Sequence, residues 1–190
     1  DFYNKTDGLW GIQIDLPHFQ WIRKVVAEYF ITKDQSGSFH FIEFDHDIHP
    51  GRGGGGDDYY NNGEYSTGYS YFNRAIGSPL IPSPEYNQDG SLGFLNNRVK
   101  DLHLGLEGDL SPLVSYRLLF TTMNSWGRHS TPFLAKKSGN SGAIDITYHH
   151  PKLESWIFKG SIAADTGNMF GKNIGFALSV SKRGIIKKWK

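Results

Sequence analysis

Alternation of apolar and polar residues is the feature of this 190-residue chain that most restricts its fold. In residues 101–108, leucine occupies every second position, and Asp, His, Gly and Glu fill the positions between the leucines. Successive side chains of an extended strand point to opposite faces of a sheet, so this period of two indicates strands with one apolar and one polar face. The same period recurs along the chain, in residues 8–16, 113–122, 144–149, 156–165 and 175–181. We therefore predict an all-β fold.

Residues 19–31 follow the pattern less regularly than the other segments. Their more apolar face also carries Arg23, and Ile22, Val26 and Phe30 interrupt the polar face. A helix is an alternative for this segment, but we predict a strand because alternation dominates the rest of the chain. The full prediction is seven strands, at residues 8–16, 19–31, 97–108, 113–123, 141–149, 153–165 and 173–183.

The connections between these segments alternate in length along the chain. The short connections are residues 16–18, 109–112 and 149–152, and the long ones are residues 32–97, 124–140 and 166–172. Outer-membrane barrels have short periplasmic turns and long extracellular loops, whereas a soluble sandwich has no reason to sort its loops by length. The pattern therefore predicts an antiparallel transmembrane β-barrel in the bacterial outer membrane, with residues 32–97 as a long external loop.

The number of strands adds a prediction about the extent of the barrel. In an antiparallel series of seven strands the first and the last run in the same direction, here toward the side of the short turns, whereas a closed bacterial barrel normally has an even number of strands with both ends periplasmic. Residues 39–44 and 65–72 could form one more pair, but the count would remain odd. We therefore expect residues 1–190 to be a single barrel domain that is incomplete at its N-terminus. The chain would be the C-terminal part of a larger barrel whose other strands precede Asp1.

Composition excludes several classes of function. The chain has no cysteine, which excludes disulfides, thiolate metal sites and cysteine nucleophiles. Twenty Lys and Arg residues nearly balance nineteen Asp and Glu residues, so there is no strong positive field of the kind that binds nucleic acid. No segment approaches the roughly 18 consecutive apolar residues of a membrane-spanning helix.

Two short motifs suggest ligand chemistry only weakly. In the sequence DHDIH, residues 45–49, the side chains of Asp45, Asp47 and His49 would project to one side of an extended segment. Such oxygen and nitrogen donors suit a divalent ion, but the spacing matches no defined site and a solvated polar loop is the alternative. The sequence GRGGGGDD, residues 51–58, lacks the Gly-Lys-Ser/Thr ending of a phosphate-binding loop. We therefore predict neither a metal nor a cofactor.

Charged residues on the polar strand faces do not indicate catalysis. The carboxylates alternate with basic residues, so we expect most of them to form pairs across the barrel interior. Neither a Gly-x-Ser-x-Gly nor a His-Glu-x-x-His motif is present, and we predict no enzyme. The carboxylates are Asp15, Glu28, Asp101, Glu107, Asp145 and Asp165, and the basic residues are Lys24, His103, Arg117, His149 and Lys159.

Aromatic residues crowd one part of the long loop. Flat aromatic rings stack on the C–H faces of sugars, and amides or charged groups hydrogen-bond to sugar hydroxyls. The alternative is that the tyrosines pack this loop into the mouth of the barrel as a plug, and both interpretations also apply to Trp126 in the next long connection. The rings of Tyr59, Tyr60, Tyr65, Tyr69, Tyr71 and Phe72 are interleaved with Asn61, Asn62, Glu64, Asn73 and Arg74. The carbohydrate-binding candidates are Tyr59, Tyr60, Tyr65, Tyr69, Tyr71, Arg74 and Trp126.

Two runs of sequence resemble a known family. Residues 59–127, which begin YYNNGEYSTGYSYF, resemble the C-terminal half of the Wzi-type capsule-assembly outer-membrane proteins. The sequence NIGFALSVSKRGII, residues 173–186, resembles the terminal strand of the same proteins. The resemblance implies a large closed barrel of roughly eighteen strands that is plugged, with a small helical bundle upstream of Asp1. It also implies a surface lectin that holds capsular polysaccharide, rather than an enzyme or an export pore.

Together, the pattern and the resemblance predict a non-enzymatic outer-membrane barrel that binds or organises surface polysaccharide, in particular capsular polysaccharide. The expected partners are that polysaccharide, the lipid and lipopolysaccharide of the outer membrane, and the remainder of the barrel. Nucleic acid is not an expected partner. Two other functions stay open: an outer-membrane transport channel, and a soluble secreted β-sandwich that is a carbohydrate-binding module or a glycosidase.

Overall fold

The computed structural model describes residues 7–35, 58–153 and 156–182 of the chain. The structure is all-β and contains a large antiparallel sheet, which confirms the predicted fold class at this level. A single turn of 3-10 helix, η1, spans Pro84–Tyr86. Within the described ranges, no helix combines the length and the apolar character needed to cross a membrane.

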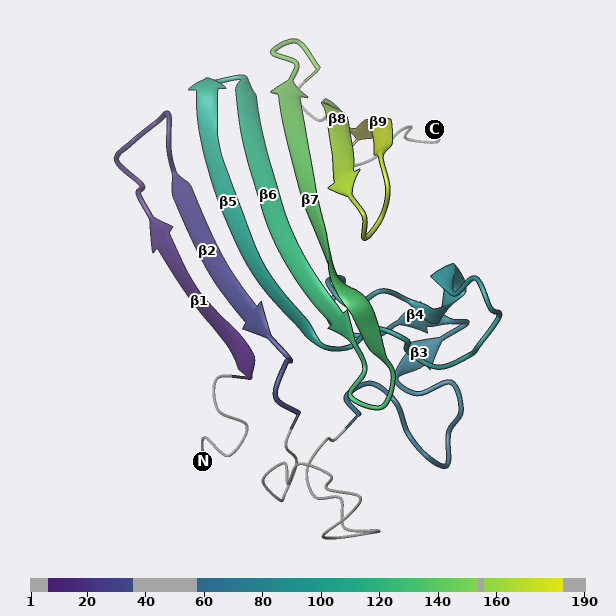
Figure 1. Cartoon of the computed structure of the whole chain (residues 1–190). Helices are drawn as coiled ribbons and strands as arrows, with labels where there is room; N and C mark the ends of the chain where they lie inside the picture. The colour runs from purple at the N-terminus through teal and green to yellow at the C-terminus, as the bar shows by residue number, and fades with distance from the viewer. Residues whose placement is uncertain (1–6, 36–57, 154–155, 183–190) are drawn as a thin grey trace, which may run out of the picture. The chain divides into compact units, whose positions relative to one another are not determined.

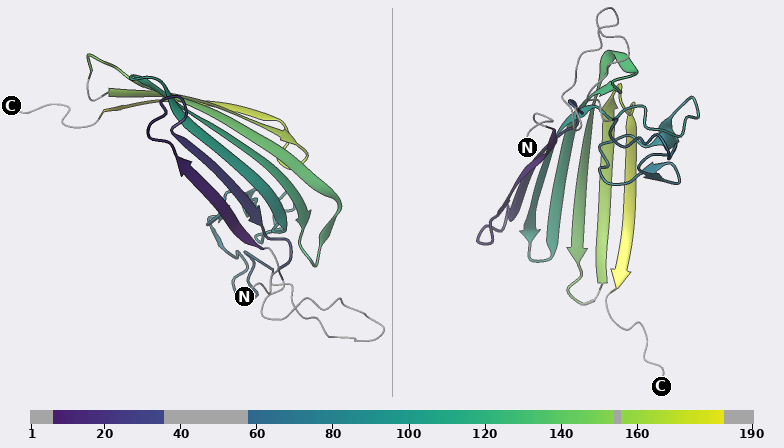
Figure 2. Two further views of the ribbon diagram at one scale, coloured as in Figure 1. Left: turned by 90° about the vertical axis from the view of Figure 1, so that its left-hand side faces the viewer. Right: turned by 90° about the horizontal axis from the view of Figure 1, so that it is seen from below.

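Seven strands form the large sheet and follow one another across it in chain order (Figure 1). Two views from other sides show the same succession of strands (Figure 2). Neighbours in the sheet are thus neighbours in the chain, apart from the insertion between β2 and β5. The strands are β1 (Gly8–Asp15), β2 (Lys24–Ile31), β5 (Val99–Ser111), β6 (Val114–Gly127), β7 (Pro132–His149), β8 (Trp156–Gly167) and β9 (Asn173–Lys182).

Each of the seven predicted strands is present, but the predicted long connection at residues 124–140 is wrong. Strand β6 continues to Gly127 and β7 starts at Pro132, so only residues 128–131 connect them. The backbone of Arg98 extends the ladder here, because its N–H donates to Gly127 O at 3.1 Å and its carbonyl accepts from Trp126 N at 3.0 Å. The strict alternation of short and long connections is therefore not observed.

The predicted strand at residues 19–31 is also too long, because residues 19–23 are not in a strand. They belong to the β1–β2 connection, which covers residues 16–23 rather than the predicted short turn at residues 16–18. Two backbone hydrogen bonds still join this connection to β5. They run from Arg23 N to Glu107 O and from Asp109 N to Gln20 O, each at 2.8 Å.

Between these two hydrogen bonds, Trp21 and Ile22 lie opposite the single residue Gly108. Two residues facing one is the arrangement of a β-bulge, which explains why strand geometry is lost here. The carbonyl oxygen of Trp21 lies where a side chain at position 108 would begin, 1.9 Å from an ideal Cβ. Glycine at position 108 thus permits the irregular pairing.

The chain divides into two compact units, which we describe separately. The first unit comprises Asp1–Trp10, Tyr29–Asp101 and Met123–Ser138, and the second comprises Gly11–Glu28, Leu102–Thr122 and Gly139–Lys190.

A small hairpin in the first unit includes the end of residues 65–72, one half of the extra strand pair considered in the sequence. Strand β3 (Ser70–Tyr71) pairs with β4 (Arg74–Ala75) and forms a two-stranded sheet. Residues 39–44 lie outside the described residues.

A buried cluster of Ile81, Phe94 and Val99 forms the core of the first unit. Phe30, Tyr60 and Ala75 pack against this cluster, so the core joins the long insertion to strands β2 and β5. Burial of these apolar side chains stabilises the insertion, because apolar area removed from water contributes about 25 cal/mol per Å².

A hydrogen-bond network around Asn97 links residues 58–59 of the insertion to residues 32–35, which follow β2. The Asn97 side chain donates to Asp58 Oδ1 at 2.5 Å and to the carbonyl of Tyr59 at 2.6 Å. Its own carbonyl accepts from Thr32 Oγ1 at 2.6 Å and from Gln35 Nε2 at 2.8 Å. Asn97 is fully buried, so its loss would leave several polar groups without partners.

The second unit has two chemically different sheet faces. The register aligns Ile144 of β7, Ile162 of β8 and Phe176 of β9 in one row. These side chains are 51%, 58% and 85% exposed, in that order. We call the face that carries this row the apolar face. Its large exposed side chains include Ile12, Ile14, Leu102, Leu104, Leu118, Phe120, Ile144, Ile146, Ile162, Ile174, Phe176, Leu178 and Val180.

The opposite face, which we call the polar face, carries ion pairs. Asp145 Oδ2 accepts from Arg117 Nε at 2.9 Å and lies 3.1 Å from Lys159 Nζ. Strand carboxylates pair with cations on adjacent segments at Asp145, at Asp15 with Lys24, and at Glu107 with Arg23, whereas pairing across a barrel interior stays a prediction. Asp165 instead accepts a hydrogen bond from Ser141. Asp101, in the first unit, differs: it is buried and accepts no hydrogen bond from the described residues.

Candidate functional site

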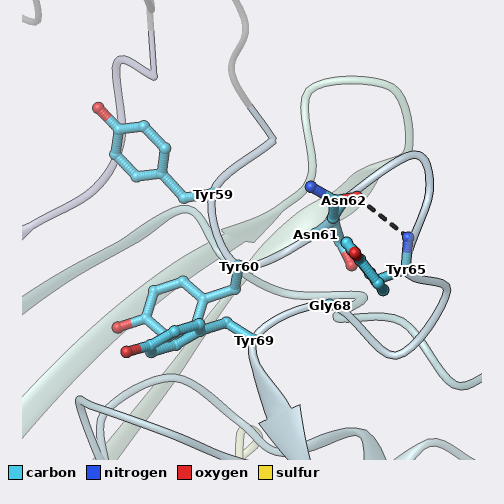
Figure 3. Close-up of a pocket in the computed structure, with 7 residues that line it drawn as sticks. All are labelled: Tyr59, Tyr60, Asn61, Asn62, Tyr65, Gly68 and Tyr69. Carbon is cyan, nitrogen blue, oxygen red and sulfur yellow. Dashed lines mark hydrogen bonds between the residues drawn. The ribbon is translucent and has the colours of Figure 1, made fainter.

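A cavity of about 450 Å³ lies in the insertion between β2 and β5, within the first unit. This volume falls in the range of roughly 300–1,000 Å³ that is typical of small-molecule sites. We call it the tyrosine pocket; its lining residues are Tyr59, Tyr60, Asn61, Asn62, Tyr65, Gly68 and Tyr69 (Figure 3). Four of the predicted carbohydrate-binding residues thus lie together: Tyr59, Tyr60, Tyr65 and Tyr69.

Tyr60 is the most firmly held ring of the pocket. Its ring centre lies 5.3 Å from that of the buried Phe94 and 6.1 Å from that of Tyr69, which it meets edge to face. Burial raises the pKa of the Tyr60 phenol above its ordinary value, and a hydrogen bond with the backbone of Ser78 offsets part of this effect. The phenol is therefore a neutral group at physiological pH.

An unusual backbone turn brings Tyr69 next to Tyr60. Tyr60 has a φ of 70° and Gly68 a φ of 56°, both in the left-handed region. The N–H of Tyr69 donates to the carbonyl of Tyr60 at 2.6 Å and closes the turn. In Figure 3 the rings of Tyr60 and Tyr69 extend in the same direction, while the ring of Tyr59 extends away from them.

Asn61 has a structural role beneath the pocket. Its Oδ1 accepts from the N–H of Phe94 at 2.8 Å, and its Nδ2 donates to the carbonyl of Phe94 at 2.9 Å. The amide therefore pairs with the Phe94 backbone as a neighbouring strand would, and it fixes the pocket segment to the core. Both polar ends of the Asn61 side chain are used in this way.

Asn62 forms the polar part of the rim. Its Oδ1 accepts from the N–H groups of Glu64 at 2.8 Å and Tyr65 at 3.0 Å, as in an Asx turn (dashed line in Figure 3). Its Nδ2 donates no hydrogen bond to the described residues, so this donor is available to a ligand. The neighbouring rings of Tyr65 and Tyr69 are 69% and 58% exposed, and they leave the rim open to solvent.

Two candidates from the same sequence cluster, Tyr71 and Arg74, do not line the pocket. Tyr71 packs edge to face on Phe72, with ring centres 4.6 Å apart. The guanidinium of Arg74 pairs with Glu85, with 3.1 Å between Nε and Oε2. Both residues belong to the β3–β4 hairpin and lie outside the pocket lining.

Trp126, a separate candidate in the predicted connection 124–140, also lies outside the pocket lining. It is part of strand β6 instead of a long loop, and the ammonium of Lys33 lies 4.6 Å from the centre of its ring. This cation–π contact links β6 to the segment after β2 and gives Trp126 a structural explanation.

Gly68, which lines the pocket, and Phe94, which supports Tyr60, were not predicted as parts of the site. A Thr-Gly pair between two tyrosines is a turn signal that could have indicated Gly68. Phe94 is distant in sequence, and no local pattern connects it to Tyr60. Asn61 and Asn62 were recognised as interleaved polar residues, but their different roles depend on hydrogen bonds that only the structure shows.

Metal and phosphate chemistry gain no support from the described residues. They contain no group of three or more His, Asp or Glu side chains that could hold a metal ion. The DHDIH motif at residues 45–49 lies outside the described residues, as does the glycine-rich run up to residue 57.

The tyrosine pocket offers flat apolar surface, phenol groups and one available amide donor. This combination suits a ligand that has both an apolar face and hydrogen-bonding edges. The lining contains no carboxylate, histidine or hydroxyl–histidine pair that could perform acid–base or nucleophilic catalysis. Comparison of the chain with protein-family models, curated proteins and solved structures finds no match.

Proposed function

We propose that this chain is part of a non-enzymatic outer-membrane β-barrel of the Wzi type, and that it binds capsular or other surface polysaccharide through the tyrosine pocket. The pocket is the observation that carries the binding function. The two faces of the sheet support the location in the membrane. Lipid and lipopolysaccharide would surround the strands.

The apolar face of the second unit supports contact with lipid. A soluble antiparallel sheet buries its apolar face and exposes its polar face to water. Here Phe176 and Leu178 are 85% and 83% exposed, while the polar face holds the Asp145 ion pairs. Strands of an outer-membrane barrel have this inverted arrangement, with apolar side chains toward lipid and polar side chains toward the interior.

Aromatic residues at the ends of the strands support the same location. Trp156 begins β8, and the ammonium of Lys182 at the end of β9 lies 5.6 Å from the centre of its ring. Tyr116 is near the start of β6, and its hydroxyl donates to the carbonyl of Trp21 at 2.6 Å. Tryptophan and tyrosine are enriched where a barrel meets the lipid headgroups.

The edges of the sheet require additional strands under this proposal. Strands β1 and β9 are the two edges of the seven-stranded sheet. An edge strand exposes unpaired N–H and C=O groups, which hydrocarbon does not tolerate. We therefore propose that further strands pair with β1 and β9 and close the barrel.

The pocket supports polysaccharide binding because its rings are held in place before a ligand arrives. Tyr60 packs on buried Phe94, and the Asn61 amide fixes the same segment to the Phe94 backbone. A preorganised site loses little conformational freedom on binding. The rings would stack on sugar C–H faces, and the amide of Asn62 would donate to a sugar oxygen.

Replacement of single tyrosines tests this function. The full chain, purified in detergent, is titrated with surface polysaccharide from the producing bacterium by isothermal titration calorimetry. We expect Tyr69→Ala to weaken binding about 5- to 30-fold, which corresponds to the loss of about 1–2 kcal/mol of ring contact. Tyr71→Ala is the matched control, because Tyr71 is as exposed as a rim tyrosine but does not line the pocket. Equal affinities of Tyr69→Ala and the unmodified chain would contradict the proposal.

A further inference from the structure

We infer that the tyrosine pocket accepts a neutral sugar residue and rejects a uronic acid, whose carboxylate replaces the CH₂OH group of the neutral sugar. This inference rests on the proposed polysaccharide binding and adds the class of sugar that is recognised.

The charge of the pocket is the first observation. None of its seven lining residues is charged. Among the described residues, the guanidinium of Arg74 pairs with Glu85, and Arg128 pairs with Asp58 through Nη2. A carboxylate that entered would lose water without gaining a cation, and burial of an unpaired charge is costly.

The hydrogen-bonding groups of the pocket are the second observation. Asn61 uses both ends of its amide on Phe94, and Asn62 uses its oxygen in the Asx turn. The remaining Nδ2 donor of Asn62 is neutral, and so is the phenol of Tyr60, whose pKa is raised by burial. Neutral donors match hydroxyl and ring oxygens, whereas a carboxylate is bound best by charged donors such as arginine.

The rim of the pocket is the third observation. Glu64 follows Asn62 closely in the sequence, and its backbone N–H is part of the Asx turn. Its carboxylate adds negative charge near the rim and would repel an anionic sugar. The exposed rings of Tyr65 and Tyr69 leave space for the polysaccharide to continue into solvent on either side of the bound residue.

Matched pairs of small sugars test this inference. The probes are the methyl glycosides of glucose, galactose and mannose and the corresponding methyl uronides, and binding to the full chain in detergent is measured by saturation-transfer NMR at neutral pH. We expect at least one neutral glycoside to bind, and its uronide to bind about tenfold more weakly, equivalent to about 1.4 kcal/mol. Tyr69→Ala should abolish the signal of the neutral glycoside, whereas Tyr71→Ala should retain it.

A substitution at Gly63 provides a complementary test, in which uronide binding is expected to become stronger. An ideal Cβ at Gly63 has no atom within 4 Å, so a side chain can begin there without a clash. Gly63→Lys adds a cation next to Asn62, and we expect it to strengthen uronide binding about two- to fivefold through an exposed charge pair. Gly63→Ala is the control and should leave both affinities unchanged.

The outcomes separate this inference from the proposed function. If a uronide binds as tightly as its neutral partner and Tyr69→Ala abolishes both signals, sugar binding stands and the neutral preference is wrong. If the surface polysaccharide binds but none of the neutral glycosides does, the inference is likewise overturned. If neither the polysaccharide nor any glycoside binds, the proposed function fails together with the inference.

Discussion

Gly68 has a left-handed backbone, and its Cα faces the carbonyl of Tyr60 so closely that an ideal Cβ would lie 2.1 Å from the oxygen. A side chain at position 68 would therefore collide with backbone, which cannot rotate away as a flexible side chain can. The same turn contains the Tyr69 N–H that bonds to Tyr60. The position of the Tyr69 ring thus depends on glycine, without a Cβ, at position 68.

We predict that Gly68→Ala destabilises the chain by about 1–3 kcal/mol, because it combines a steric clash with an unfavourable φ. Urea unfolding followed by tyrosine fluorescence measures this loss, and glycan binding should weaken with it. Gly63→Ala is the control, since its Cβ meets no atom within 4 Å. Equal stability of the two variants would show that the turn is not fixed by Gly68.

Only part of the site could be predicted at the scale of residues. Interleaved tyrosines and asparagines indicated Tyr60 and Tyr69, which the structure brings together in one pocket. They could not exclude Tyr71, whose direction is set by a turn in which Phe72 and Asn73 have φ of 47° and 61°. Phenylalanine is rare in the left-handed region, so the sequence does not predict a tight hairpin at Phe72 and Asn73.

The backbone pairing between the residues just before β2 and strand β5 contains a β-bulge. Trp21 and Ile22 face Gly108 alone, and the pairing resumes where Arg23 bonds to Glu107. A bulge bends a strand and increases its twist, so it commonly occurs near the rim of a sheet. The end of the β1–β2 connection is therefore shaped by a residue on β5.

We predict that Gly108→Ala costs roughly 1–3 kcal/mol of stability, because an ideal Cβ lies 1.9 Å from the carbonyl oxygen of Trp21. Gly105→Ala is the matched control on the same strand. Its Cβ would contact Leu119 at 3.4 Å and Val26 at 3.6 Å, which are ordinary distances. The urea midpoint should fall for Gly108→Ala alone; a similar fall for both variants would contradict the bulge.

Alternation predicted where strands lie better than where they end. The polar residues 124–140 have no apolar stripe, so the sequence suggested a loop. Backbone hydrogen bonds between Arg98 and residues 126 and 127 continue the ladder to the end of β6. Such bonds depend on residues that are distant in sequence, and they leave no period in the chain itself. A loop predicted from polar sequence alone, such as residues 124–140, is therefore longer than the observed connection at residues 128–131.

The two faces of the sheet define how the whole molecule meets its surroundings. In the register of β8 and β9, Gly160 is opposite Leu178 on the apolar face, and Ser161 is opposite Ala177 on the polar face. Adjacent positions on β9 therefore sample opposite environments. This difference allows the proposed lipid contact to be tested without altering any loop.

We predict that Leu178→Arg lowers stability in lipid vesicles by about 2–4 kcal/mol, because a charge on the lipid face of a barrel is strongly unfavourable near the bilayer centre. Ala177→Arg should be tolerated, since it points to the polar face. The measurement is the yield of the folded, heat-modifiable form after assembly into vesicles. If Leu178→Arg assembles as well as Ala177→Arg, the apolar face does not contact lipid, and a water-soluble sheet becomes the better interpretation.

The hydrogen bonds between Asn61 and the Phe94 backbone separate the residues that hold the pocket in place from those on its rim. Under the proposed function, recognition rests on rim side chains such as Tyr65 and Tyr69, whereas attachment rests on the Asn61 amide and the backbone of Phe94. Substitutions at the rim leave these attachment bonds untouched. Bacterial strains that change their coat could therefore acquire new sugar preferences through a few rim mutations, while the scaffold is inherited without alteration.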